Sequence, residues 1–268
     1  MVVACTPISH PAPPVPIPDA HAAADPVYTG NVVALHEAAE HTLHSLIGAL
    51  DAEKRAKLAG ITLAFDATDG DVNAYATCAQ TGLPLVAVSD GLLEIARQLA
   101  IAQAADATYG TARVRAYQHW IAKHPGHVAP AQVADGRTLQ LARVLFVEEL
   151  AYVIGHELGH HYLGHLGCVD GGGVVEKMGR IASAEVPLFS QAAELAADSV
   201  GVANTLEVGR TTGWTEAGAV LMLQFFRSGQ TWQEVVFAFE KSHPLSEFRL
   251  PTVTATADLW RATDGVGY

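Results

Sequence analysis

The sequence has few charged residues, and most of them are negative. Charged side chains make up 16% of the 268 residues, and 28 Asp and Glu against 16 Lys and Arg give a formal net charge of −12 at pH 7. Nucleic acids and anionic lipid surfaces bind proteins through clusters of Lys and Arg. The composition therefore argues against a nucleic-acid partner and against electrostatic docking on a membrane.

Long apolar runs are also missing, although 50% of the residues are hydrophobic. A membrane-spanning helix needs about 18 or more consecutive apolar residues. The longest candidate is interrupted by Arg143, Glu148, Glu149 and several histidines. We therefore expect no transmembrane segment, and the hydrophobic content is sufficient for the core of one large domain.

Cysteine is scarce, and Cys5, Cys78 and Cys168 do not form a zinc-finger pattern. Three cysteines are compatible with free thiols, or with one disulfide and a separate third cysteine. Cys5 follows small and aliphatic residues that resemble the end of a bacterial lipoprotein signal, but no charged start or apolar stretch precedes them. Either Cys5 carries a lipid anchor, or its resemblance to a lipoprotein signal is a coincidence.

Proline is concentrated near the start, where Pro7 to Pro18 holds six of the 13 prolines. Such a segment is extended and semi-rigid, as a tether would be. We therefore divide the chain into a Pro-rich tail over residues 1–29, a candidate lipoprotein tether, and a single domain over residues 30–268.

Apolar spacing predicts several helices and a small sheet. Helical periodicity predicts one helix over 31–58 and another that is capped by Ser89 or Asp90. β-rich alternation predicts strands at 61–65, 72–76 and 85–88. Residues 103–137 are interpreted as a surface helix plus loop. The spacing of His36, His41 and His44 does not hold all three on one face, and no acidic or cysteine partner completes a site, so they are interpreted as surface histidines.

The most informative stretch reads H-E-x-x-H, from His156 to His160, in a helix that is apolar nearly all round and begins near Asp135 or Thr138. Two histidines four positions apart leave one face of a helix and can bind the same metal ion. Zinc in such a site assists peptide hydrolysis, and Glu157 can accept a proton from water. Chance occurrence in an ordinary helix is the alternative.

Gly155 and Gly159 each lower the helix propensity by about 1 kcal/mol relative to alanine. We expect another backbone to pack closely against them. A third zinc ligand should come from a second helix, and Glu194 is the best candidate. Asp198 lies on the same face and can orient a ligand histidine through its second nitrogen. A solvated acidic face is the alternative, but the surrounding small residues argue against it.

These stretches together resemble the gluzincin metallopeptidases of the HtpX and CaaX-prenyl endopeptidase family. The likeness covers roughly residues 30 to 250 and rests on H-E-L-G-H at 156–160, E-L-A-A-D at 194–198, S-H-P-L-S-E-F-R at 242–249, and a similar sheet region with Asn73-Ala74-Tyr75 and Gly91-Leu92-Leu93. The resemblance implies one Zn²⁺ per chain, held by His156, His160 and Glu194. It implies that Glu157 acts as general base and then as general acid.

The same resemblance implies roles for three further residues. Asp198 would be the partner of a ligand histidine. His243 would either steady the oxyanion or occupy the open coordination position in a resting form, and Arg249 would hold that segment or a carboxylate. His161 and His165 point away from the ligand face or lie a turn away, and we assign them no role.

We predict an α+β, mainly helical fold: a gluzincin-like metallopeptidase domain with a small β-sheet beside the active-site helix. The predicted activity is zinc-dependent endopeptidase hydrolysis of unfolded or misfolded polypeptides, bound as a strand added to the sheet edge. The alternative is a chaperone-like or binding protein whose zinc site is closed and inactive.

The chain lacks the membrane helices of the family's integral members and resembles its soluble, envelope-located (BepA-like) members. That resemblance implies a periplasmic or outer-membrane-associated lipoprotein that acts in envelope protein quality control. A cytoplasmic protease is the alternative.

Overall fold

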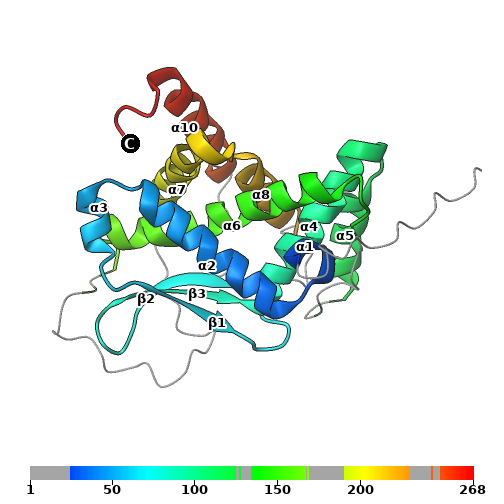
Figure 1. Cartoon of the computed structure of the whole chain (residues 1–268), viewed down its shortest axis with the longest axis horizontal. Coiled ribbons are helices and arrows are strands. Elements are labelled where there is room, and N and C mark those ends of the chain that lie inside the picture. The colour runs from blue at the N-terminus through cyan, green and yellow to red at the C-terminus, as the bar shows by residue number, and fades with distance from the viewer. Residues whose placement is uncertain are drawn as a thin grey trace, which may run out of the picture.

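The centre of the fold is a pair of long helices that pack against each other (Figure 1). The computed structural model describes residues 25–124, 127, 134–166, 168, 190–229, 243 and 248–268. The central pair is α6 (Leu139–Tyr162) and α7 (Gln191–Thr212), with α8 (Ala217–Gly229) against α6 and α10 (Arg249–Thr263) against α7 and α8. A small sheet lies on one side of α6, so the fold is α+β and mainly helical, as predicted.

The region from residue 31 to residue 58 forms two helices, so the single helix predicted there is wrong. Helix α2 (Val32–Ala49) ends where Leu50 adopts an extended conformation, with ψ 152°. Asp51 then caps α3 (Ala52–Lys57), because its side chain accepts a hydrogen bond from the Lys54 backbone N–H at 2.8 Å. The apolar spacing continues across this break, but the capping signal ends the helix.

The chain before α2 packs against the domain. Asp25 caps the short helix α1 (Pro26–Thr29), pairs with Arg143 of α6, and is followed by Val27, which is buried. Arg97 donates a hydrogen bond to the Val27 carbonyl at 2.9 Å. The remainder of the Pro-rich tail, with Cys5, lies outside the described residues.

Within the described residues the sheet consists of three strands in the order β1-β3-β2. Strands β1 (Thr62–Asp66) and β3 (Pro84–Ser89) are parallel, and β2 (Ala74–Cys78) is antiparallel to β3, with Ala74 opposite Val88. All three strands lie within two residues of the predicted positions. Because β2 is at the edge, one row of its backbone groups faces away from β3.

Ser89 caps the next helix as predicted, since its side chain accepts a hydrogen bond from Leu92 N–H at 3.2 Å. Helix α4 (Asp90–Tyr109) is followed by α5 (Arg113–Lys123). The prediction of a surface helix within 103–137 is only partly right, because Tyr117 and Ile121 of α5 are buried in the core.

Helices α6 and α7 approach at the level of their backbones. A side-chain carbon added at Gly155 would lie 3.1 Å from the Gly201 carbonyl oxygen, and one added at Gly201 would lie 2.8 Å from the His156 backbone nitrogen. At Gly159 the added carbon would lie 3.2 Å from the Ala197 Cα. The close approach predicted from the two helical glycines is therefore confirmed.

A disulfide between Cys78 and Cys168 joins the end of β2 to the chain just beyond α6. The bond has a sequence separation of 90 residues, and a disulfide that closes a long loop stabilises a fold typically by about 2–4 kcal/mol. His161 adds a second connection, because its Nε2–H donates to the Leu85 carbonyl of β3 at 3.0 Å. The end of α6 is therefore fixed to the sheet.

Within the described ranges, no helix combines the length and the apolar composition that a bilayer crossing requires.

One buried carboxylate makes the stability of the fold depend on pH. Glu149 of α6 has no exposed surface, and neither of its carboxylate oxygens has a hydrogen-bond partner in the described part of the chain. Burial, and to a smaller extent the charge of Glu148, raises the pKa of Glu149 well above its ordinary value. The folded state therefore retains a proton that the unfolded state releases above about pH 4.3, and stability falls as pH rises from there towards the folded-state pKa.

We expect Glu149→Gln to reduce this loss. Between pH 5 and pH 8 the melting temperature of the variant should fall less than that of the wild type. In a domain of this size, each 1 kcal/mol of unfolding free energy that the variant retains should raise its melting temperature by about 2–4 °C. Thermal melts followed by circular dichroism measure the difference, and exposed Glu53→Gln is the control. Parallel pH dependence in wild type and Glu149→Gln would contradict the assignment.

Candidate metal centre

Four side chains from distant parts of the sequence converge in the core beside β2. His156 and His160 come from α6 and Glu194 comes from the first turn of α7, and all three are at most 1% exposed. With His243, each offers one ligand atom, and these atoms lie within 4.8 Å of one another. The two histidines and the glutamate that the sequence assigned to zinc are therefore brought together.

The distances between the ligand atoms suit a single small cation. His156 Nε2 lies 3.1 Å from His160 Nε2 and 3.3 Å from Glu194 Oε2, and His160 Nε2 lies 3.5 Å from Glu194 Oε1. Four tetrahedral ligands at zinc–nitrogen distances of about 2.0–2.1 Å are separated by about 3.3 Å. The observed spacing matches that value closely.

His243 lies between the cluster, the sheet edge and Glu157. Its Nε2–H donates to the Ala74 carbonyl of β2 at 3.0 Å, so Nδ1 of the neutral ring carries the lone pair. This Nδ1 lies 3.1 Å from Glu194 Oε2 and 3.3 Å from His156 Nε2. His243 is thus oriented as a fourth ligand in this conformation.

Glu157 is buried next to the cluster without a strong partner. Neither of its carboxylate oxygens has a hydrogen-bond partner among the described residues, and Oε1 lies 3.3 Å from His243 Nε2. A buried carboxylate without hydrogen bonds is costly unless a function or a ligand uses it. The carboxylate of Glu157 is therefore not engaged by a hydrogen bond from the described residues.

A network of hydrogen bonds fixes the ring of His156. Its Nδ1–H donates to Asp198 Oδ1 at 2.9 Å, which leaves the Nε2 lone pair in the cluster. Arg249 donates to both oxygens of Asp198, from Nε at 2.7 Å and from Nη2 at 2.6 Å, and the Tyr152 hydroxyl donates to Oδ1 at 2.8 Å. The predicted partners Asp198 and Arg249 are in place. Tyr152 was missed, although it lies one helical turn before His156.

His165 also contacts the centre, although its position beyond the ligand face predicts no role for it. Its Nδ1 lies 2.9 Å from Nδ1 of His160, so it accepts a hydrogen bond from the ring nitrogen that faces away from the cluster. Gly164 adopts φ +78° after the end of α6, and the backbone N–H of His165 donates to the His160 carbonyl. This turn brings the His165 side chain back to α6. Helical periodicity does not predict the direction of side chains beyond the end of the helix.

Residues 37–172 match the model of peptidase family M48. The chain belongs to this family. Comparison with curated proteins and with solved structures gave no match. The matched residues of this M48 metallopeptidase include His156, Glu157 and His160. Glu194 and His243 lie beyond the match, so their place in the centre rests on the geometry of this structure.

The electrostatics of the M48 centre follow from its burial. Burial lowers the pKa of His156, but hydrogen bonds with Asp198 and Glu194 outweigh it and raise the pKa to about 9. Burial lowers the pKa of His160 to about 3. Burial raises the pKa of Glu194, but hydrogen bonds from the cluster histidines outweigh this and bring it well below its ordinary value. Glu194 is therefore ionised at neutral pH.

The donor set fits a zinc ion. Imidazole nitrogens and a carboxylate are common zinc ligands. The second ring nitrogen of each of the three histidines has a hydrogen-bond acceptor, so each ring in its neutral form would direct a lone pair into the cluster. Glu194 Oε1 has no hydrogen-bond partner in the described part of the chain, as expected for an oxygen that a cation would bind.

Two substitutions test the centre through its metal affinity. Glu194→Ala removes a ligand and should weaken zinc binding by more than about 100-fold, because loss of a group that only orients a ligand costs about 10–100-fold. His165→Ala removes a group that only orients His160, so it should weaken zinc binding by about 10–100-fold. Competition with a fluorescent zinc chelator measures both, and exposed His41→Ala should bind zinc as the wild type does. Unchanged zinc content in Glu194→Ala would place the third ligand elsewhere.

Proposed function

We propose that this M48 metallopeptidase is a zinc-dependent endopeptidase that cleaves unfolded or misfolded polypeptides. The observation that supports it most is the convergence of His156, His160 and Glu194 from two helices, with the unpaired carboxylate of Glu157 beside them. In the proposal these three side chains hold one zinc ion per chain. When bound, zinc polarises the scissile carbonyl and makes water more acidic.

The chain's own residues then perform the proton transfers. Glu157 accepts the proton of the attacking water and delivers it to the nitrogen of the leaving amine. Its burial and the lack of hydrogen bonds to its oxygens leave the carboxylate available for this. Asp198, held by Arg249 and Tyr152, keeps the His156 ring in the orientation in which Nε2 faces the centre.

The substrate would bind as an added strand along β2. On its far side from β3 no strand is present in the described part of the chain, and the Ala74 carbonyl points there, since His243 donates to it. Main-chain hydrogen bonds to an edge strand require an extended polypeptide and little side-chain selection. Unfolded proteins supply such segments.

His243 occupies part of this path in the observed conformation. Its contacts with Glu194, His156 and Ala74 favour the resting-form role over that of an oxyanion donor. The same contacts are the observation behind the second candidate function, a binding or chaperone-like protein with a closed and inactive zinc site.

Glu157→Gln separates catalysis from metal binding. The variant should lose about 10²–10⁴-fold in kcat/KM towards a reduced and alkylated unfolded polypeptide, because general acid and base catalysis contributes that much. Its zinc content should be unchanged. The assay follows new peptide termini with and without 1,10-phenanthroline, and exposed Glu37→Gln is the matched control.

Three outcomes of this assay are informative. Turnover retained by Glu157→Gln would remove this residue from the mechanism. An inert wild type with an active His243→Ala variant would support the resting form. Zinc-loaded wild type and His243→Ala that both fail to cleave would favour the binding-protein alternative.

We further propose that the protein acts in the cell envelope, with Cys5 as the site of a lipid anchor, rather than in the cytoplasm. The disulfide between Cys78 and Cys168 supports an oxidising compartment, where such bonds persist. Mass spectrometry of the terminal peptide from native cells should find Cys5 carrying a diacylglyceryl group in the membrane fraction. Unmodified Cys5 in a cytosolic fraction would contradict this location.

A further inference from the structure

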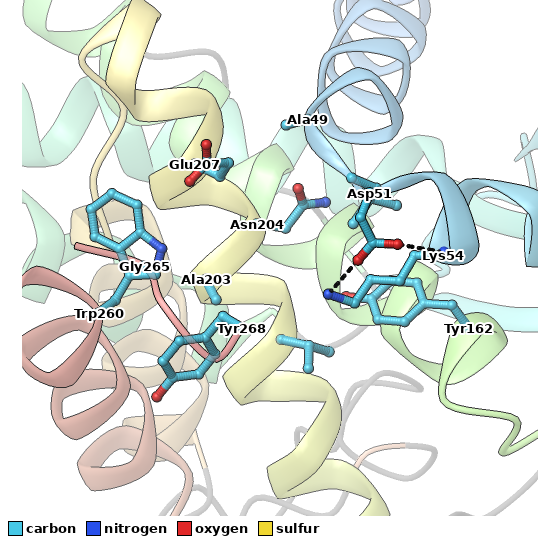
Figure 2. A pocket seen from close by; sticks show the side chains of 12 residues that line it. Ala49, Asp51, Lys54, Tyr162, Ala203, Asn204, Glu207, Trp260, Gly265 and Tyr268 are labelled. Carbon is cyan, nitrogen blue, oxygen red and sulfur yellow. Dashed lines mark hydrogen bonds and ion pairs between the residues drawn. The ribbon is translucent and has the colours of Figure 1, made fainter. Parts of the chain in front are cut away.

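A pocket of about 230 Å³ lies between the α2–α3 junction on one side and α7 and α10 on the other (Figure 2). Trp260 and Tyr268 lie on one side of it, and Asp51, Lys54 and Tyr162 lie on the other. None of the residues of the metal centre lines it. It is therefore a separate site, for which the proposed hydrolysis has no use.

Asn204 of α7 supplies an unpaired polar group to this pocket. The residue is only 5% exposed, and neither the oxygen nor the nitrogen of its amide has a hydrogen-bond partner in the described part of the chain. Other polar side chains of α7 do have partners, since the hydroxyls of Ser199 and Thr205 donate hydrogen bonds to backbone carbonyls one turn earlier. A buried amide without partners destabilises a fold unless water or a ligand supplies them.

The pocket also has aromatic walls. Tyr162 is buried, and the Arg210 guanidinium lies over the Trp260 ring, 4.5 Å from its centroid. Arg210 is itself fixed by Glu207 at 2.8 Å and by Asp264 at 2.7 Å. Rigid aromatic walls favour a planar apolar group, which can stack on them or meet them edge to face.

The charges around the pocket exclude anions. Asp51, Lys54 and Glu207 are the charged residues that line it, which leaves one net negative charge at neutral pH. The Lys54 ammonium is already engaged by Asp51, at 3.1 Å. A phosphate or a carboxylate would therefore find no free cation in this lining, whereas a neutral group meets no electrostatic barrier.

The size of the pocket limits the ligand further. Pockets for drug-sized ligands usually enclose about 300–1,000 Å³, so 230 Å³ suits one aromatic side chain with its adjoining polar groups. A carboxamide offers a donor and an acceptor side by side. In an extended polypeptide the N–H and the C=O of one residue point to the same side and match this pair.

We propose that this pocket binds a neutral aromatic amide, as presented by an aromatic residue within a polypeptide. Asn204 pairs with the amide groups, and Trp260, Tyr162 and Tyr268 enclose the ring. The proposal concerns binding alone and holds whether or not the chain hydrolyses peptides.

N-acetyl-L-phenylalaninamide is the probe, titrated against the full-length Glu157→Gln variant and followed by ligand-observed NMR. We expect a dissociation constant on the order of 1 mM for a ligand of this size. The anionic analogue N-acetyl-L-phenylalanine should bind more weakly. Asn204→Leu should weaken binding of the amide about tenfold, because it removes the hydrogen bonds and keeps the apolar volume.

Gln224→Leu is the matched control, a similar substitution at an exposed position of α8 that does not line this pocket, and it should bind as the parent does. Circular dichroism checks that Asn204→Leu is folded. Tyr268→Ala, at the partly exposed wall, provides a second variant that should also weaken binding. Absence of binding, or equal binding by the parent and Asn204→Leu, would overturn the proposal and leave water as the partner of Asn204.

A second arm distinguishes a polypeptide from a free small molecule as the source of the amide. The probe is extended by two glycines on each side. If the extended peptide binds as tightly as the probe, the pocket accepts an aromatic residue within a polypeptide, as proposed. Loss of affinity on extension would overturn the polypeptide assignment.

Discussion

The contact between the backbones of α6 and α7 is the constraint on which the rest of the structure depends. Gly155 and Gly201 face each other so closely that a side-chain carbon on Gly201 would collide with α6, and one on Gly155 would be tightly crowded by α7. Across this close contact Glu194 and Asp198 of α7 meet the histidines of α6. The glycines lower the helix propensity of α6 and α7, but the close packing that they permit offsets this cost.

This packing places an unusual number of charges in the core. Glu157, Glu194 and Asp198 are three buried carboxylates. Among the described residues, Arg249 is the one buried guanidinium that contacts any of them, and it reaches Glu194 and Asp198. With neutral histidines the group carries two surplus negative charges, which is expensive away from water. One divalent cation balances it. Without the metal, a proton on His156, whose pKa is raised to about 9, supplies part of that compensation. Metal binding must then release this proton, as is usual for histidine ligands.

The sequence was most informative where local spacing decides the geometry. The pairs His156 with His160 and Glu194 with Asp198 are four residues apart on a helix, so their common direction follows from helical periodicity alone. By the same rule Tyr152 could have been found, since it lies four residues before His156. The break between α2 and α3 also has a local signal, because Asp51 is a capping residue, but the apolar periodicity that continues across it predicts a single helix.

Other parts of the centre depend on tertiary structure. His243 and Arg249 reach the cluster from far along the chain, and only the resemblance to a known family pointed to them. His165 was misjudged because a helical face was extended past the residue where the helix ends. At Gly164 the chain reverses, and the following side chain returns to His160. The pairing of Cys78 with Cys168 likewise follows from where β2 and the end of α6 meet, which spacing does not reveal.

The metal centre and the Asn204 pocket use different faces of α7. Glu194, Asp198 and Gly201 face α6, whereas Val200, Asn204 and Glu207 line the pocket. The close packing of α7 on α6 opposes a shift between the two helices, so we do not expect an occupant of the pocket to displace Glu194. Its effect on the centre would instead be that of a tether, which raises the local concentration of the rest of the chain. Ten helical residues separate Glu194 from Asn204, or about 15 Å along the axis. An extended polypeptide covers about 3.3 Å per residue, so the bound aromatic residue would have to lie at least about five positions along the chain from the bond that is cleaved.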